Sequence, residues 1–346
     1  MQVFGMNLRR YSMALLVLAL IMGFTANVFA TGAPEQETAT TGKIDFPTRP
    51  VTFIVGWDAG GGSDIVSRIL CAEAEKFLGQ PITIVNMPGG SGTRSYTEIA
   101  NAKPDGYTIG NTTGTISTHV FAGNLNFGHE AFVPIMTMND DPGAIWVKQD
   151  APWQTLDDLI KDLKANPESI TIASSNPASI TRFGTIMLEQ VAGVRFRIAS
   201  QAGGESAGPT LVAGGHVDAA QAAPVTAKAL YEGGKIRSLG VMADQRVPAF
   251  PDIPTYKEQG YDASIGNLRQ IIAPKDTPQE IVDILYEAFR KAANSETYVK
   301  FMNESGSTPL DWDYKKSREF LIQQDKDFSE ILKSIGQYVE PVGRAQ

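Results

Sequence analysis

The sequence predicts an α/β protein in which parallel strands alternate with helices. Short apolar runs typical of strands occur at 51–56, 82–85 and 107–110, and the segments between them have helical periodicity. Loops rich in glycine, serine and threonine follow several strands. Strands joined by helices pair in parallel through right-handed crossovers, so we expect these loops to gather at one edge of a sheet.

The first part of the chain begins with a strand that leads into a run of glycines. A helix is predicted after Ser63, where apolar residues recur at helical spacing, and Gly79 and Pro81 end it. The strand at 82–85 is followed by the loop 88–93 and by a second helix that ends at Ala102.

A second α/β unit is predicted to start near 145–147. Thr155 and Asp158 have the spacing of a capping box, and the helix that they open ends at Asn166 and Pro167. The remaining predicted strands are 170–173, 194–198, 217–220 and 236–242, and the remaining predicted helices end at Gly193, begin near Pro224, and span 278–293 and 313–335.

Composition excludes several classes of protein. A chain of 346 residues with 42% hydrophobic and 20% charged residues is long enough for about two globular domains and too polar for a polytopic membrane protein. Its formal charge is −8 and it has no run of Lys or Arg, so nucleic acid is not an expected partner. The single cysteine and three scattered histidines give no ligand set for a structural metal, and no cofactor is expected.

The N-terminus has the pattern of an export signal. Arg9 and Arg10 precede an apolar stretch at 13–24, and small residues at 28 and 30 predict cleavage after Ala30. A retained anchor helix is the alternative interpretation. Residues 1–30 hold two arginines and no acid, so their removal changes the formal charge from −8 to −10. Residues 31–43 are predicted to be a disordered leader to the folded part of an exported protein.

One local sequence pattern occurs three times: a predicted strand, then a loop of small residues, then the start of a helix. It is found at 60–64, 89–93 and 174–181. Backbone N–H groups and the helix dipole favour an anion at such a start, so the repetition indicates a ligand that carries carboxylate or phosphate groups. The alternative is that the glycines only permit tight turns.

Nucleotide binding and catalysis are weaker interpretations. The segment 90–95 approaches the dinucleotide fingerprint, but Ser95 stands where its third glycine belongs. Cys71 lies within a predicted helix and fits a small core residue. Ser91 lacks the following glycine of a nucleophile elbow, because position 93 is Thr93. No catalytic residue is predicted, and an exported α/β enzyme or a Rossmann-like protein remains the alternative.

With these loops in view, the chain resembles the TctC or Bug-like periplasmic receptors of the tripartite tricarboxylate transporter (TTT) system. The matching stretches run in order over roughly residues 46 to 340. They are FPTRPV (46–51), GGGSDIVSR (60–68), NMPGGSG (86–92), KPDGYT (103–108), GGHVD (214–218), GGKIR (233–237), PDIPT (251–255), GNLR (266–269) and APK (273–275).

The resemblance implies a type II periplasmic-binding-protein fold of the Venus-flytrap kind, with ligand in a cleft and two crossing strands as the hinge. Domain I would comprise 44–142 and 268–346, and domain II would comprise 143–267. The resemblance further implies a monomeric receptor, not an enzyme. It would capture a small carboxylate, such as a tricarboxylate, dicarboxylate or amino acid, and deliver it to a permease of one large and one small membrane subunit.

The resemblance also implies the ligand-binding residues. Donors of domain I would be Gly60, Gly61, Gly62, Ser63, Ser91, Gly92, Thr93, Thr113 and Thr115. Those of domain II would be Ser174, Ser175, Ser179 and Thr181. Because the chain is acidic, we expect recognition by N–H dipoles and one local cation, for which Arg94, Arg182 and Arg269 are candidates.

The loop Trp57-Asp58-Ala59 completes the predicted site, and it departs from the family pattern. An acidic residue stands at Asp58 where the family usually has a neutral one, and our hypothesis is that it faces an ammonium group or a metal-chelated carboxylate. A solvated loop carboxylate is the alternative. Trp57 is assigned either to cover an apolar ligand body or to pack internally. A second departure is Ala222-Ala223, where many members carry Asn or Asp.

Overall fold

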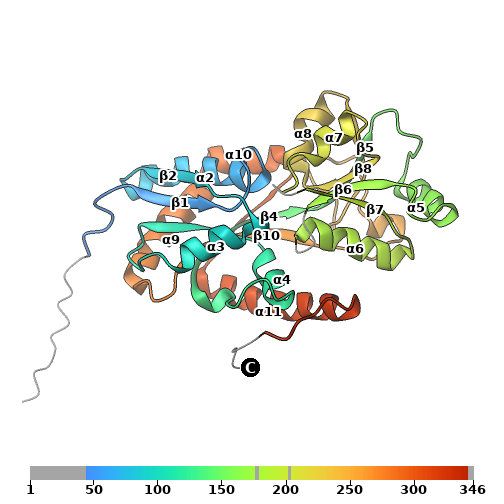
Figure 1. Ribbon diagram of the computed structural model, residues 1–346. Helices are drawn as coiled ribbons and strands as arrows, with labels where there is room; N and C mark the ends of the chain where they lie inside the picture. The colour runs from blue at the N-terminus through green and yellow to red at the C-terminus, as the bar shows by residue number, and fades with distance from the viewer. Residues whose placement is uncertain (1–43, 176–178, 202–203, 342–346) are drawn as a thin grey trace, which may run out of the picture. The chain divides into compact units, whose positions relative to one another are not determined.

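The computed structural model describes residues 44–175, 179–201 and 204–341. The predicted signal peptide and leader lie outside these residues. Every strand and helix of these described residues belongs to one compact unit, Asp45–Gln346. Within the described ranges no helix is long and apolar enough to cross a membrane. The strands form two sheets (Figure 1).

The first sheet combines a parallel part with an antiparallel part. In the parallel part, β1 (Val51–Val55) lies between β2 (Ile82–Asn86) and β3 (Thr108–Thr112). In the antiparallel part, β10 (Gly266–Pro274) lies between β3 and β4 (Phe132–Pro142), and β11 (Thr308–Trp312) flanks β4. In this sheet the expectation of parallel pairing is therefore correct for β1 to β3. It is wrong for β4, β10 and β11, which the sequence pattern did not reveal.

The second sheet is also mixed. Its order is β7 (Arg197–Gln201), β6 (Thr171–Ser175), β8 (Ala219–Ala222), β5 (Ala144–Lys148) and β9 (Ile236–Val241). The pairs β6–β7 and β6–β8 are parallel, whereas β5 is antiparallel to both β8 and β9. The expectation of parallel pairing is therefore wrong for the predicted strand near 145–147 as well.

The chain passes between the two sheets twice. Strand β4 of the first sheet ends at Pro142, and β5 of the second begins at Ala144. The return runs from the end of β9 to the start of β10. Figure 1 shows β4 and β10 between the two groups of strands. Residues at the ends of these two long strands are thereby placed next to both sheets.

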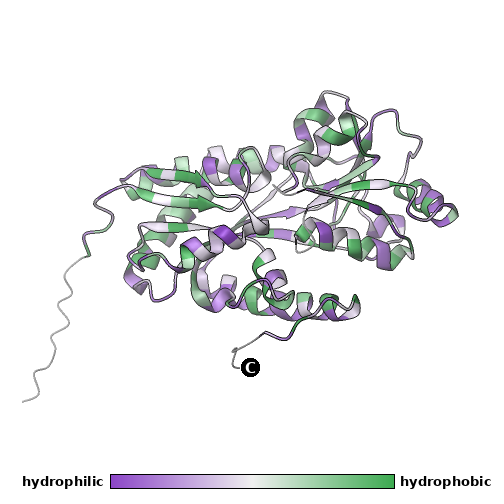
Figure 2. Cartoon of the chain, in the orientation of Figure 1, coloured by the Kyte–Doolittle hydropathy of each residue, from purple (hydrophilic) through white to green (hydrophobic). Residues whose placement is uncertain are grey.

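Helices cover the sheets, and several of their ends follow local rules. Gly79 adopts the left-handed conformation and caps the first helix, and Thr155 and Asp158 form the predicted capping box. Green and purple residues alternate along many helices in Figure 2, as expected for helices with one buried face. The helices are α2 (Gly62–Leu78), α3 (Thr93–Ala100), α4 (Thr115–Phe121), α5 (Leu156–Ala165), α6 (Ile180–Ala192), α7 (Gly208–Ala213), α8 (Pro224–Glu232), α9 (Gln279–Ala293), α10 (Glu296–Ser305) and α11 (Tyr314–Ser334).

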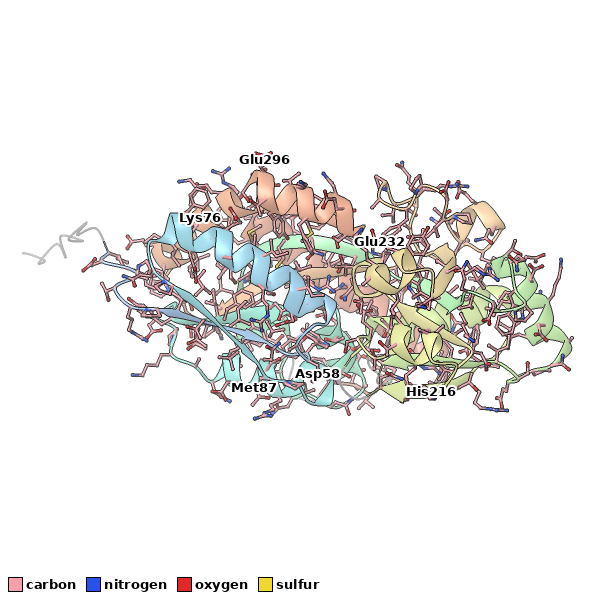
Figure 3. All side chains as sticks on the ribbon, turned by 90° about the horizontal axis from the view of Figure 1, so that it is seen from above. Asp58, Lys76, Met87, His216, Glu232 and Glu296 are labelled. Carbon is pink, nitrogen blue, oxygen red and sulfur yellow. The ribbon has the colours of Figure 1, made fainter. Side chains whose placement is uncertain are left out.

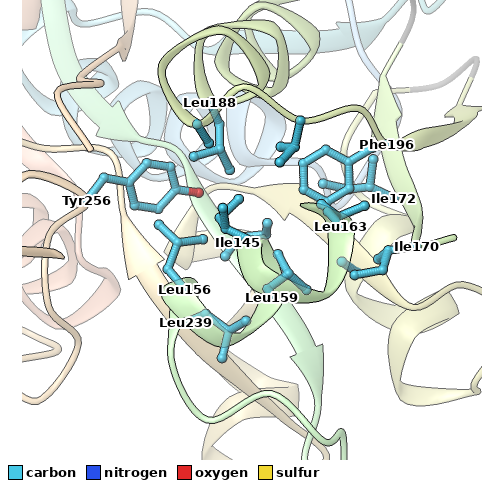
Figure 4. Packing of buried hydrophobic residues seen from close by; sticks show 14 of the residues in the cluster. Ile145, Leu156, Leu159, Leu163, Ile170, Ile172, Leu188, Phe196, Leu239 and Tyr256 are labelled. Atoms are coloured by element: carbon cyan, nitrogen blue, oxygen red, sulfur yellow. The ribbon is translucent and has the colours of Figure 1, made fainter. Parts of the chain in front are cut away.

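A core of branched and aromatic side chains supports the second sheet. Leu159 of α5 packs with Ile145 of β5 and with Phe196, which precedes β7 (Figure 4). Each of these side chains is at most 4% exposed. Fully burying such a side chain contributes about 1.5–3 kcal/mol, so this packing fixes the sheet on which part of the site is built.

Candidate functional site

A cavity lies where loops of the first sheet meet loops of the second. The first-sheet side contributes the residues after β1 and β3, and the second-sheet side contributes the residues around the start of α6 and before α7. Its lining consists of Trp57, Gly61, Gly62, Ser63, Thr113, Thr115, Ser175, Ser179, Ile180, Thr181, Gly204, Glu205, Asn267 and Arg269. Ten of these fourteen residues are predicted site residues.

The start of α2 presents backbone donors to the cavity. Gly61 is its N-cap and, as a glycine, supplies no side-chain cap to the first N–H groups of the helix. The loop is held by Asp64, which accepts hydrogen bonds from Gly60 N at 2.9 Å and Arg68 Nε at 2.9 Å. Burial alone would raise the pKa of Asp64, but these bonds and one from Asn86 lower it. The ionised Asp64 therefore fixes a loop that offers N–H groups to an anion.

The start of α6 presents hydroxyl groups from the other side. Ser179 is the N-cap, and its Oγ accepts a hydrogen bond from Arg182 N at 3.1 Å. The Oγ of Thr181 lies 3.1 Å from that of Ser179 and accepts a hydrogen bond from Ser175 N at 3.3 Å. These bonds hold the hydroxyl-bearing residues together at a helix N-terminus.

Two threonines after β3 complete the hydroxyl lining. The Oγ atoms of Thr113 and Thr115 lie 3.0 Å apart, and the latter lies 2.6 Å from the hydroxyl of Tyr96. All three side chains are buried, so their orientation is fixed by one another.

Arg269 is the cation of the cavity. Its side chain is 1% exposed, its Nε donates to Ser63 Oγ at 2.9 Å, and its guanidinium pairs with Asp141. Burial lowers the pKa of Arg269 to about 10, which still leaves it charged at neutral pH. Of the three candidate arginines it alone lines the cavity, while Arg94 is exposed at the start of α3 and Arg182 is half-buried in α6.

Of the predicted loop Trp57-Asp58-Ala59, only Trp57 lines the cavity. The Trp57 indole lies in the cavity wall and faces Gly204, where an added Cβ would lie 3.1 Å from the nearest indole carbon. Asp58, Ala59 and Gly60 are not among the lining residues. Figure 3 shows Asp58 on the side of the first sheet that faces the second.

The second predicted loop and one serine also lie outside the lining. Ser91 and Gly92 lie in a short 3-10 helix, and Thr93 is the first residue of α3. The Ser91 carbonyl lies 3.3 Å from the His119 ring. The side chain of Ser174 is buried at the end of β6. The roles predicted for these residues stay predictions.

Four lining residues were not expected from the sequence: Ile180, Gly204, Glu205 and Asn267. Glu205 follows β7 in another loop of the strand, glycine and helix type, and this pattern could have identified it. Asn267 belongs to the GNLR stretch, in which only Arg269 was expected to bind. In the described ranges no cluster of His, Cys, Asp or Glu could hold a metal ion.

Residues 66–337 match the family model described as the tripartite tricarboxylate transporter family receptor. A relative, the UPF0065 protein in the gbd 5' region of Cupriavidus necator, is 29% identical over 319 residues, which cover 91% of this chain and 95% of that protein.

Two solved structures are similar along most of the chain. The periplasmic binding protein BugD is 27% identical with a TM-score of 0.80, over 85% of this chain and 100% of BugD. MatC from Rhodopseudomonas palustris, solved with bound malate, is 25% identical with a TM-score of 0.77, over 83% of this chain and 100% of MatC. These likenesses confirm the predicted two-domain binding-protein fold.

Proposed function

Since the chain belongs to the receptor family of the tripartite tricarboxylate transporters, we propose that it captures a small carboxylate in the cavity around Arg269. The observation that carries this proposal is the convergence of two helix starts and one buried guanidinium on a single cavity. N–H groups at a helix start, hydroxyls and a guanidinium all donate hydrogen bonds to carboxylate oxygens.

The donors come from two separate sheets, which supports capture by closure. A carboxylate held at the start of α2 and a second group held at the start of α6 would bridge the two sides. Such a ligand makes more contacts when the two sides are close, and it therefore favours that arrangement. We assign the sides to the predicted domains, 44–142 with 268–346 and 143–267, although β10 already begins at Gly266.

The family and the similar structures support a receptor, not an enzyme. The receptor is proposed to work in the periplasm as a monomer and to hand its ligand to the two membrane subunits of a TTT permease. MatC binds malate, a small dicarboxylate, and this supports the ligand class for the present chain.

A ligand panel in a thermal-unfolding assay tests the proposal. A bound ligand stabilises the folded protein by RT ln(1 + [L]/Kd), or about 2.7 kcal/mol at a hundredfold excess over Kd. We expect at least one mono-, di- or tricarboxylate to raise the Tm in a concentration-dependent way and to be recovered unchanged. The proposed receptor function would be contradicted if a nucleotide raised the Tm while no carboxylate did. It would also be contradicted if a carboxylate were consumed.

Two arginine variants test whether Arg269 binds the ligand. Arg269→Lys keeps the charge but removes the planar fork that reaches both Ser63 and Asp141, so we expect the affinity for the carboxylate to fall at least tenfold. Arg94→Lys makes the same change at an exposed arginine outside the cavity and should leave the affinity unchanged. Calorimetric titration of the two variants measures both, and equal effects would argue against Arg269 as a ligand group.

A further inference from the structure

We propose that the captured carboxylate also carries an ammonium group, and that Glu205 receives this ammonium in the cavity. The inference rests on the proposed function and narrows its ligand class to amino carboxylates. It starts from an acidic side chain in the wall of a cavity whose other polar groups are mostly donors to an anion.

Two hydrogen bonds fix the carboxylate of Glu205. Its Oε2 accepts from Ala223 N at 3.1 Å, and its Oε1 accepts from Thr226 Oγ1 at 3.1 Å. Both partners belong to the start of α8, so the carboxylate is anchored to the second sheet. Each oxygen keeps further acceptor capacity, because a carboxylate offers about four lone-pair sites.

Gly62 shows how near Glu205 lies to the anion-binding groups. An ideal Cβ placed on Gly62 would lie 3.3 Å from Glu205 Oε1 and 2.5 Å from Arg269 Nη2. The acidic group and the guanidinium thus approach the first residue of α2 together. Arg269 is nevertheless paired with Asp141, and in the described ranges no ion pair includes Glu205.

An uncompensated acid beside an anion site favours one kind of ligand. A dicarboxylate without nitrogen would bring its negative charge next to Glu205. An ammonium on the ligand would instead neutralise Glu205 while the ligand carboxylate meets Arg269 and the α2 start. Burial raises the pKa of Glu205, which is the shift that a neighbouring cation would oppose.

A second acceptor lies in the same cavity. The Oδ1 atom of Asn267 is buried and has no hydrogen-bond partner among the residues that the structure describes. Asn267 stands beside Asp141 in the register of β10 and β4. An ammonium has three donors, enough for Glu205, Asn267 and one more group.

Titration of matched ligand pairs tests the inference. The pairs are L-aspartate with succinate, L-glutamate with glutarate, and L-alanine with propionate, with citrate added, so that each pair differs by one amino group. We expect the wild-type protein to bind the amino member of the preferred pair at least tenfold more tightly. Glu205→Gln should reduce this preference at least tenfold and leave the binding of the nitrogen-free partner unchanged or tighter.

Asp58→Asn tests the competing acid, for which the sequence left open either an ammonium contact or a solvated loop carboxylate, and which does not line the cavity. It should keep the wild-type preference. Glu205→Asp, which keeps the charge on a shorter side chain, should retain part of it and replaces Glu205→Gln if that variant does not fold.

Three results would overturn the inference. The first is that the ligand bound most tightly by the wild-type protein lacks nitrogen, a result that requires no variant. Another is an unchanged preference in Glu205→Gln, and the third is a preference lost in Asp58→Asn instead. In each case the proposed function, capture of a small carboxylate, is still supported. If no carboxylate binds, the proposed function fails, and the inference fails with it.

Discussion

Arg269 lies beside two acids that differ in their surroundings. Asp141 is 1% exposed, pairs with Arg269 and accepts a hydrogen bond from Asn139 Nδ2 at 2.8 Å. Asp140, the preceding residue, points to the other face of β4, and burial raises its pKa to about 6 despite the attraction of Arg269. Strand β4 thus supplies one acid that pairs with the cavity arginine and a second acid whose pKa is raised to about 6 by burial.

The raised pKa of Asp140 predicts a pH-dependent stability. An acid whose pKa is about 6 in the folded chain and 3.8 when unfolded contributes stability that is complete below pH 3.8 and is lost as the pH rises through about 6. Asp140→Asn does not titrate. Between pH 4 and pH 7 we therefore expect the wild type to lose up to roughly 3 kcal/mol of unfolding free energy relative to the variant.

Urea unfolding of both proteins at several pH values measures this difference. Asp252→Asn, at an exposed aspartate, is the control and should show no such trend relative to the wild type. A wild-type to Asp140→Asn difference that stays constant from pH 4 to pH 7 would show that folding does not raise the pKa of Asp140.

At the scale of elements, the caps of α5 and α6 are alike in geometry but differ in what their helix starts face. Ser179 caps α6 through Arg182 N, and Thr155 caps α5 through Asp158 N, both at 3.1 Å. The start of α6 lines the cavity, whereas that of α5 does not. Variants of the two caps therefore distinguish the contribution of a cap to helix stability from its contribution to ligand binding.

We expect Ser179→Ala and Thr155→Ala each to lower the unfolding free energy by about 1 kcal/mol, because each leaves a backbone N–H without its cap. Only Ser179→Ala should also weaken carboxylate binding, by about three- to tenfold for one lost hydroxyl contact. Urea unfolding and calorimetric titration measure the two effects. Equal affinities in the two variants would exclude Ser179 from the ligand's contacts.

The elements also show where local pattern is informative. The loop and helix at Ser179 and the capping box at Thr155 were predicted, because caps and glycines act within a few residues. Strands β4 and β10 were not predicted. In β4 the residues are buried on both faces and include Thr137, Asn139 and Asp141, so neither alternation nor a purely apolar run marks it. Strand β7 begins at Arg197, three residues later than the predicted strand 194–198, because Val194 and Phe196 pack in the core before the ladder starts.

For the whole molecule, charge sets the conditions of capture. The chain has a formal charge of −8, which repels an approaching anion at long range. The donors of the cavity act only at short range, because they are dipoles and one paired guanidinium. Added salt screens the long-range repulsion and barely affects buried contacts.

We therefore expect the association rate constant for a dicarboxylate ligand to rise with salt between about 10 mM and 150 mM, while the dissociation rate changes little. Stopped-flow fluorescence follows both, since Trp57 lies in the cavity wall. The rise should be smaller for a ligand of lower net charge, which serves as the control. An association rate that falls with salt would indicate a positive local field at the cavity entrance.

The helix starts, the small-residue loops and the family resemblance can all be recognised in the sequence, because each depends on residues close together in the chain. Ten lining residues were predicted in this way. The choice among the three candidate arginines required the folded structure, since the contact of Arg269 with Ser63 spans 206 positions and depends on the register of β10 against β4. The same is true of Glu205, which reaches Gly62 from the other sheet. A contact made by strand register and by the meeting of two sheets leaves no periodic signal in the chain, because its energy depends on groups that are distant in sequence.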